Sequence, residues 1–185
     1  MSKAIEQAYG IPARFFHWIT AFLLIVQYAI GILMPDVHRD TKPEGLIAWH
    51  LTVGVLIVLV VLLRLVWRAA HGTPAELETI PRHLRMLASA THWVLYALLV
   101  AVPLLGWANA SSRGWRVALA GIVPLPPLSQ HGSSIGHEAG DIHQLLSWVL
   151  LALIGLHVCA AVFHHVVLGD NTLRRMLPRR SQDDI

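Results

Sequence analysis

The chain has 185 residues, which is enough for a single domain. Hydrophobic residues make up 55% of the sequence and charged residues only 14%, against about 25% in ordinary soluble domains, so composition excludes a disordered chain and disfavours a water-soluble globule. The net charge of +3 gives no reason to expect a nucleic-acid partner, and the one cysteine, Cys159, excludes an intrachain disulfide.

Four long stretches without Asp, Glu, Lys or Arg follow one another along the chain, at 15–35, 45–63, 86–112 and 142–169. A helix needs about 20 apolar residues to cross the hydrocarbon core of a membrane. The stretches therefore predict four transmembrane helices in one domain that spans residues 1–185, at about 12–34, 46–68, 88–110 and 142–168. The expected fold class is an all-α membrane protein with a four-helix bundle.

A fifth uncharged stretch, 117–137, is long enough to cross a membrane but differs from the other four in composition. It contains helix-breaking residues, namely Pro124, Pro126, Pro127, Gly132 and Gly136. Irregular backbone exposed to lipid is not tolerated inside a membrane. We therefore expect a loop here, with a short apolar piece at 117–128 lying at the membrane interface.

The basic residues are unevenly divided between the two ends of the expected bundle. With a cytoplasmic N-terminus, ten of them fall on the cytoplasmic side: Lys3, Arg14, Arg64, Arg68, Arg82, Arg85, Arg174, Arg175, Arg179 and Arg180. Four fall on the opposite side: Arg39, Lys42, Arg113 and Arg116. Because cytoplasmic loops of membrane proteins carry an excess of Lys and Arg, the pattern predicts that both termini are cytoplasmic.

Histidines recur at a helical spacing in the expected transmembrane segments. His143 and His157 are 14 residues apart on the fourth segment. At about 100° and 1.5 Å per residue, this offset puts both side chains on one helix face, roughly 21 Å apart. The other segments carry polar or small residues at the same offset: His17 and Gly31, His50 and Arg64, and His92 and Gly106. The sequence therefore predicts two levels of functional groups, one near each membrane surface.

The alternating direction of the helices pairs these histidines by depth. An imidazole inside a membrane is costly and is usually functional. Two facing neutral imidazoles suit the iron of a haem, and the cores of helix bundles are common places for such cofactors. We therefore predict two non-covalent b haems, an inner one held by His17 and His157 and an outer one held by His50 and His143. We expect the glycines to leave room for the flat macrocycle.

Other chemistries fit this pattern less well, and two residues keep alternative roles. A single His can serve as an interhelical hydrogen-bonding residue, but here four histidines match in two levels. A zinc site needs three or four clustered ligands. A proton relay favours acidic residues, which the four stretches lack. A histidine-lined metal transporter without haem remains an alternative. His92, at the inner level, either replaces His17 as a ligand or contacts a haem propionate or ring. Arg64 either pairs with a propionate or reaches toward lipid phosphate.

Several short motifs are distributed along nearly the whole chain. They are Phe-His-Trp at 16–18, Ala-Trp-His-Leu-Thr-Val-Gly at 48–54, Ser-Arg-Gly-Trp at 112–115, Ile-Gly-Leu-His at 154–157, and His-His-Val-Val-Leu-Gly-Asp-Asn-Thr-Leu-Arg-Arg-Met-Leu-Pro at 164–178. In these motifs the chain resembles the bacterial cytochrome b561 family, in particular its superoxide oxidase branch. The resemblance implies a four-helix bundle in the bacterial inner membrane with two b haems, whose ligand positions match His17, His50, His143 and His157.

The resemblance also implies a reaction and a set of partners. Members move electrons between the periplasmic side and the quinone pool, and superoxide oxidases pass electrons from superoxide to ubiquinone. The family's quinone contacts fall on Arg82, where the family has Lys, and on His164. Judged from its position in the sequence alone, His164 faces either a membrane-soluble redox partner or a lipid headgroup. Arg113 and Arg116 are expected to attract the superoxide anion. A cytochrome b subunit docked to a periplasmic dehydrogenase or hydrogenase is the alternative.

Overall fold

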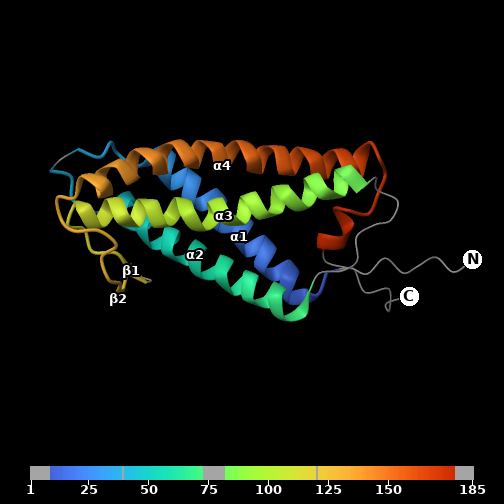
Figure 1. Cartoon of the computed structure of the whole chain (residues 1–185), viewed down its shortest axis with the longest axis horizontal. Coiled ribbons are helices and arrows are strands. Elements are labelled where there is room, and N and C mark those ends of the chain that lie inside the picture. Colours follow the sequence, from blue (N-terminus) through green and yellow to red (C-terminus); the bar gives the residue numbers. More distant parts are fainter. Residues whose placement is uncertain (1–8, 39, 73–81, 120, 178–185) are drawn as a thin grey trace, which may run out of the picture.

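The computed structural model describes residues 9–38, 40–72, 82–119 and 121–177. Its elements follow in the order α1 (Ile11–Leu33), α2 (Leu46–His71), α3 (Arg82–Ser112), β1 (Ala118–Leu119), β2 (Val123–Pro124), α4 (Ser134–Val166) and the short 3-10 helix η1 (Arg174–Met176) (Figure 1). Within the described ranges, α1 to α4 are each long and apolar enough to cross a membrane. The predicted fold class, an all-α membrane protein with four spanning helices, is confirmed.

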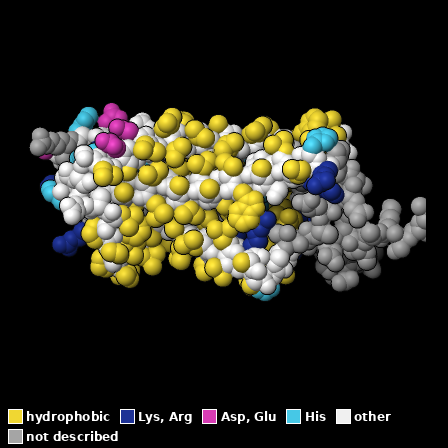
Figure 2. All heavy atoms as spheres, viewed as in Figure 1, with side chains coloured by type: hydrophobic (Ala, Val, Ile, Leu, Met, Phe, Trp, Pro, Cys, Tyr) yellow, Lys and Arg dark blue, Asp and Glu magenta, His cyan; other side chains and the backbone are white. Residues whose placement is uncertain are grey.

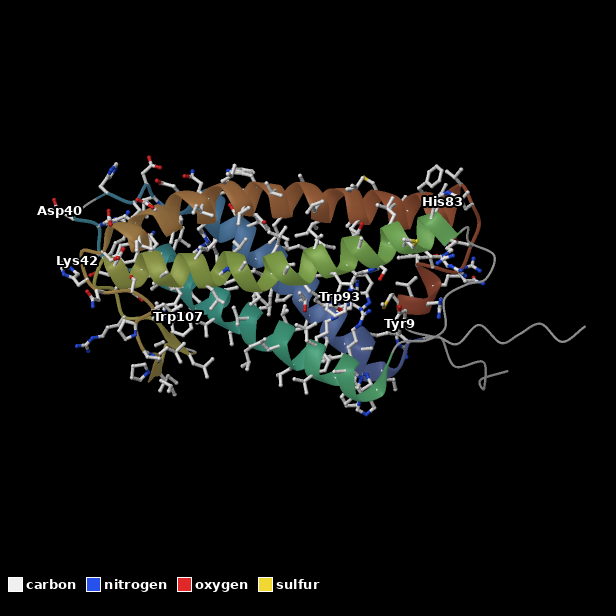
Figure 3. All side chains as sticks on the ribbon, viewed as in Figure 1. Tyr9, Asp40, Lys42, His83, Trp93 and Trp107 are labelled. Atoms are coloured by element: carbon white, nitrogen blue, oxygen red, sulfur yellow. The ribbon has the colours of Figure 1, made fainter. Side chains whose placement is uncertain are left out.

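The two ends of the bundle carry most of the polar residues. The inner end is the end where α1 begins and α4 stops, and the labels of Tyr9 and His83 mark it in Figure 3. The outer end is the opposite one, and the labels of Asp40 and Lys42 mark it. Hydrophobic side chains cover the middle of the face shown in Figure 2, and charged side chains lie mainly toward its two ends. Four of the basic residues that predict the topology lie outside the described residues: Lys3, Arg39, Arg179 and Arg180.

In the fifth uncharged stretch, residues 134–137 form the start of α4, where the sequence predicts a loop. The described residues before them form no membrane-spanning helix, but they contain a small hairpin where the sequence predicts only a loop. β1 and β2 are antiparallel, with Leu119 opposite Val123, and β1 packs on α2. Gly121 has a φ of 71°, a conformation that glycine adopts at little cost and that tight turns often require. Beyond it, Ile122 is 82% exposed, so the hairpin presents an apolar side chain outward.

The helices pack as two antiparallel pairs that meet along one side. α1 lies against α2, α3 lies against α4, and the contact between α2 and α3 joins the two pairs. The buried core lies at this junction, where Ile57 and Val61 of α2 belong to one cluster with Leu99 of α3. Among the four helices, α1 and α4 have no comparable backbone contact, although the hydroxyl of Tyr28 donates a hydrogen bond of 2.7 Å to the carbonyl oxygen of Ser147. The bundle is therefore more open between its first and last helices.

Small residues allow α3 and α4 to approach closely. A Cβ atom on Gly136 of α4 would lie 2.5 Å from the Cβ atom of Ser112 in α3. Two helical turns further along α4, His143 lies beside Gly106 of α3 in the same register. Close backbone approach at small residues is typical of helix contacts in membranes, and here it sets the depth at which α4 carries its histidines.

Gly136→Ala tests this close contact. The added methyl group has no space beside Ser112, so we expect the change to cost about 1–3 kcal/mol, as overpacking usually does. Thermal unfolding of the detergent-solubilised protein should show a melting temperature several degrees lower. Gly155→Ala is the matched control, because a Cβ atom on Gly155 would meet nothing within 4 Å. Equal melting temperatures for the two variants would show that α3 and α4 do not touch at this level.

Candidate functional site

His50 of α2 and His143 of α4 face each other toward the outer end. Their ring centroids are 6.1 Å apart, and the ring planes cross at 83°. A metal–nitrogen bond to imidazole is about 2.0–2.1 Å long, and the bonded nitrogen lies about 1.1 Å from the ring centroid. Two imidazoles that bind one metal ion from opposite sides would therefore have ring centroids about 6.3 Å apart. The spacing of this outer pair therefore fits two ligands on opposite sides of one iron.

α3 holds the ring of His143 in place. Its Nδ1 donates a hydrogen bond of 2.8 Å to the carbonyl oxygen of Val102, which leaves Nε2 as the nitrogen for a metal. A Cβ atom on Gly106 would lie 3.0 Å from two atoms of this ring, so glycine provides space that a side chain would take. Across the pair, the buried Nδ1 of His50 has no hydrogen-bond partner among the described residues. A buried polar atom without a partner indicates that another group completes the site.

A cavity of about 720 Å³ adjoins the outer pair. Both histidines line it, together with Gly31, Gly106 and apolar side chains that include Leu99. Pockets for cofactors and other small molecules commonly have volumes of about 300–1,000 Å³ and a mostly apolar lining. The cavity and the paired imidazoles therefore fit a flat, largely apolar macrocycle such as haem.

His17 of α1 and His157 of α4 form a second pair at the inner level. Their ring centroids are 6.4 Å apart, which again fits two axial ligands on one iron. His92 of α3 lies closer to His157, at 5.4 Å between ring centroids, and its Nδ1 donates to the carbonyl oxygen of Ala88 in its own helix. Because 5.4 Å is short for two imidazoles on opposite sides of one metal ion, the geometry favours His17 over His92 as the partner of His157.

Two arginines of α2 lie close to the inner pair. Nη2 of Arg64 is 3.4 Å from Nδ1 of His17, and its guanidinium lies over the ring of Tyr96 at 5.3 Å. Arg68, one turn further on, lies over the rings of Tyr96 and Trp93, the latter labelled in Figure 3. Neither guanidinium forms an ion pair with a carboxylate among the described residues. Cations at membrane depth usually have an anionic partner, and these two arginines have none among the described residues.

The two residues expected to contact quinone both lie at the inner end. Arg82 is exposed at the start of α3, and His164 is half-buried near the end of α4. These helix ends lie side by side (Figure 1). His164 nevertheless bonds a different residue, because its Nδ1 donates to the carboxylate of Asp170 at 2.5 Å.

The structure separates the two arginines expected to attract superoxide. Arg113 is half-buried and lines the cavity of the outer histidine pair, donates a hydrogen bond to the carbonyl oxygen of His38, and lies over the ring of Trp115. Arg116 is exposed and lines a second cavity of about 500 Å³. Trp115 lines both cavities and therefore stands between them. Of the two, Arg113 is the cation beside the outer pair.

Sequence reasoning did not single out three residues that the structure brings to the site. Arg68 and Tyr96 extend the contacts of Arg64, and Asp170 holds His164. A signal for Arg68 was available, because it follows Arg64 by one helical turn. Asp170 lies within the 164–178 motif, but its contact with His164 depends on how the chain turns after α4.

Comparisons with known proteins give the family. A family model described as prokaryotic cytochrome b561 matches residues 8–179. Cytochrome b561 homolog 2 of Escherichia coli K12 is 28% identical and covers 96% of this chain and 95% of its own length. The probable superoxide oxidase CybB of Yersinia pestis is 30% identical over 89% of this chain and 92% of its own. A probable Ni/Fe-hydrogenase B-type cytochrome subunit of Rhizobium leguminosarum is 23% identical over 95% and 90%.

These matches bear on the alternatives that the sequence left open. A haem-free metal transporter does not agree with a cytochrome model that matches nearly the whole chain. Within the described residues, moreover, no group of three or more His, Cys, Asp or Glu side chains is arranged to hold a metal ion. The chain belongs to the prokaryotic cytochrome b561 family, and is thus a multi-pass protein of the bacterial inner membrane that binds b-type haem and transfers electrons.

Proposed function

We propose that the chain holds two b haems at different depths, the outer one between His50 and His143 and the inner one between His17 and His157. The ring separations of 6.1 and 6.4 Å support this assignment, since both fit one iron between two imidazoles. When bound, each haem would supply one-electron transfer, and the two histidines of its pair would hold it. Because α4 contributes one histidine to each pair, His143 and His157, the two pairs lie roughly 21 Å apart along this helix.

Arg64 and Arg68 hold the propionates of the inner haem in this proposal. An arginine only donates hydrogen bonds, so Nδ1 of His17 has to accept the 3.4 Å contact from Arg64. A His17 that binds iron through Nε2 carries its proton on Nδ1, and Arg64 then needs another acceptor. A propionate carboxylate provides one in a charge-assisted contact. His92 is a neighbour of this haem and not a ligand.

The proposed activity is that of a superoxide oxidase, a superoxide:ubiquinone oxidoreductase. The observation that carries it is the position of Arg113, a cation that lines the same cavity as His50 and His143. Positive charge near a site raises the local concentration of an anionic substrate, and superoxide is an anion. The 30% identity to a probable superoxide oxidase supports the same activity. Two superoxide anions each lose one electron to become dioxygen, and one ubiquinone gains two electrons and two protons to become ubiquinol.

The quinone site is assigned to the inner end, on the cytoplasmic side. Arg82 and His164 would contact the two quinone oxygens there. The outer end then faces the periplasm, so that electrons enter near Arg113 and leave near His164. Protons for quinol formation come from the cytoplasmic side.

The alternative function is that of a cytochrome b subunit docked to a periplasmic dehydrogenase or hydrogenase. The relative named as a probable Ni/Fe-hydrogenase B-type cytochrome subunit supports it. Both functions use the same haems and the same quinone, and they differ in the electron donor. A superoxide oxidase works alone, whereas a subunit depends on a partner protein.

The test is ubiquinone reduction by the purified protein alone under an enzymatic superoxide flux. We expect quinol to form at a rate that depends on the protein concentration and that added superoxide dismutase abolishes. No quinol formation with both haems in place would exclude the superoxide oxidase activity and favour the subunit.

A double variant, Arg82→Ala with His164→Ala, tests the inner quinone site. Neither residue is a proposed iron ligand, so haem content and the rapid reduction of haem by superoxide should be retained. Loss of charge-assisted contacts worth about 1.5–3 kcal/mol each should lower steady-state quinone reduction by about tenfold or more. Excess quinone should partly restore the rate.

His83→Ala is the matched control, because His83 is exposed and follows Arg82 directly. We expect this variant to turn over quinone like the unaltered protein. Full turnover in the double variant would move the quinone site elsewhere on the chain.

A further inference from the structure

The segment after α4 folds back over the inner end of the bundle. We call residues 167–177 the clasp. Gly169 has a φ of 65° and reverses the chain direction, and the backbone N–H of Asp170 then donates to the carbonyl oxygen of His164 at 3.1 Å. The clasp ends against α1, where the side chains of Trp18 and Arg14 donate to the carbonyl oxygens of residues 176 and 177. It thereby adds a second hydrogen-bonded link between α1 and α4, besides the one from Tyr28 to Ser147 (Figure 1).

The turn at Gly169 fixes a carboxylate against His164. Oδ2 of Asp170 accepts a hydrogen bond of 2.5 Å from Nδ1 of His164, and Oδ1 accepts one of 2.9 Å from the backbone N–H of Thr172. Burial alone would raise the pKa of Asp170, but the hydrogen bonds from His164 and Thr172 outweigh burial and lower this pKa below its usual value. Asp170 is therefore a carboxylate at neutral pH, held by one donor on each oxygen.

His164 is placed to act on a molecule at the inner membrane surface. It follows His157 by seven residues, so it lies on nearly the same face of α4, about 10 Å closer to the inner end. Its Nδ1 is engaged by Asp170, while Nε2 has no hydrogen-bond partner among the described residues. A carboxylate on one imidazole nitrogen fixes the orientation of the ring and favours its protonated form, in which the other nitrogen also carries a proton that it can transfer.

We propose that Asp170 is a positioning residue that makes His164 the proton donor to the quinone oxygen. The inference rests on the quinone site proposed above. In each transfer the Nε2–H bond of the imidazolium breaks and an O–H bond forms on the quinone, while Asp170 stays ionised. Cytoplasmic water then reprotonates the imidazole. Two such transfers, together with two electrons taken from two superoxide anions, convert one ubiquinone to ubiquinol.

Among the described residues, the charged groups around this end of α4 other than Asp170 are basic. On the packed elements they are Arg82 and Arg85 of α3 and Arg174 and Arg175 of the clasp, and His165 is the next residue on α4. Within the described part of the chain, Asp170 is thus the negative group that contacts His164. Replacing it with the isosteric Asn keeps the hydrogen bond to Thr172 possible but removes the charge.

Asp170→Asn, measured in the haem-loaded protein under a superoxide flux, is the test. We expect haem content and the reduction of haem by superoxide to be unchanged, kcat for quinone reduction to fall by about tenfold, and KM for ubiquinone to stay within about twofold. The solvent deuterium isotope effect on kcat should increase, because proton delivery becomes limiting. Adding His164→Gln to Asp170→Asn should cause little further loss of kcat, since the two residues act as one unit in proton delivery.

Three further variants separate positioning from support of the fold. Glu138→Gln removes one carboxylate charge at the far end of α4 and should leave kcat unchanged. Trp18→Phe removes a hydrogen bond between the clasp and α1 without touching the Asp170 contact. If Asp170 only supports the clasp, Trp18→Phe should lower kcat as much as Asp170→Asn does.

Asp170→Glu keeps the negative charge and should retain more activity than Asp170→Asn. If the role of Asp170 were purely structural, the longer side chain of Glu would retain no more activity than Asn.

The outcomes distinguish this inference from the function on which it rests. Normal kcat in Asp170→Asn with impaired His164→Gln would overturn the role of Asp170 and leave the quinone site intact. Normal kcat in both variants would overturn the quinone site itself. Equal effects of Asp170→Asn and Trp18→Phe, with no change in isotope effect, would reduce Asp170 to a structural residue.

Discussion

His17→Ala and His157→Ala should each remove one and the same spectral component of haem b, and His50→Ala and His143→Ala should each remove the other. Each change takes away one of the two imidazoles that face each other across 6.4 or 6.1 Å, and a non-covalent haem left with one axial ligand is held weakly. We expect about two extractable haems per unaltered chain and about one in each variant. Pyridine haemochrome assays and redox difference spectra measure both quantities.

Two comparisons make this result decisive. His71→Ala removes an exposed histidine at the end of α2 and should keep both haems. His92→Ala should also keep both, with at most a shifted spectrum of the inner haem. Loss of a haem in His92→Ala but not in His17→Ala would exchange the roles of these two residues. A single haem in the unaltered protein would exclude the arrangement at two levels.

Gly106→Val should abolish the outer haem and leave the inner one in place. A Cβ atom at this position already comes within 3.0 Å of the ring of His143, and valine adds two methyl groups beyond it. The ring has little freedom to move away, because Nδ1 bonds the carbonyl oxygen of Val102. An imidazole displaced by a fraction of an ångström at its base no longer presents Nε2 to an iron shared with His50. The same haem spectra used for the histidine variants report the loss.

Gly155→Val is the matched control for this change. Gly155 is exposed on α4, and a Cβ atom there meets nothing within 4 Å, so both haems should remain. Retention of the outer haem in Gly106→Val would show that His143 binds from a different rotamer, and the glycine would then have only a packing role.

The gaps between charged residues predict the number and order of the helices but not their ends. α4 begins at Ser134, so its first two turns include Glu138 and Asp141, both exposed. Charged residues are costly only within the hydrocarbon, and a helix that continues into water can carry them. The start of α4 is instead marked by a local signal, the side chain of Ser133, which accepts a hydrogen bond from the backbone N–H of Gly136.

The histidine pairs were accessible to sequence reasoning because the 14-residue offset is a property of one helix. His143 and His157 share a face of α4 whatever the rest of the chain does, and the helix directions then give each a partner. Contacts that depend on tertiary packing have no such regularity. Arg113 and Arg116 are three residues apart in the sequence, yet they line different cavities because the helix ends at Ser112. The contact of Asp170 with His164 depends on the reversal at Gly169.

The place of α4 in both histidine pairs has a consequence for the biosynthesis of the protein. His17 and His50 are made early, but neither pair is complete until α4 has left the ribosome and entered the membrane. The clasp, which joins α4 to α1, is made later still. In the proposed arrangement, a nascent chain interrupted before α4 has half of each ligand set, and we expect it to retain neither haem. With the ligands proposed above, acquisition of haem therefore requires that α4 has already been made.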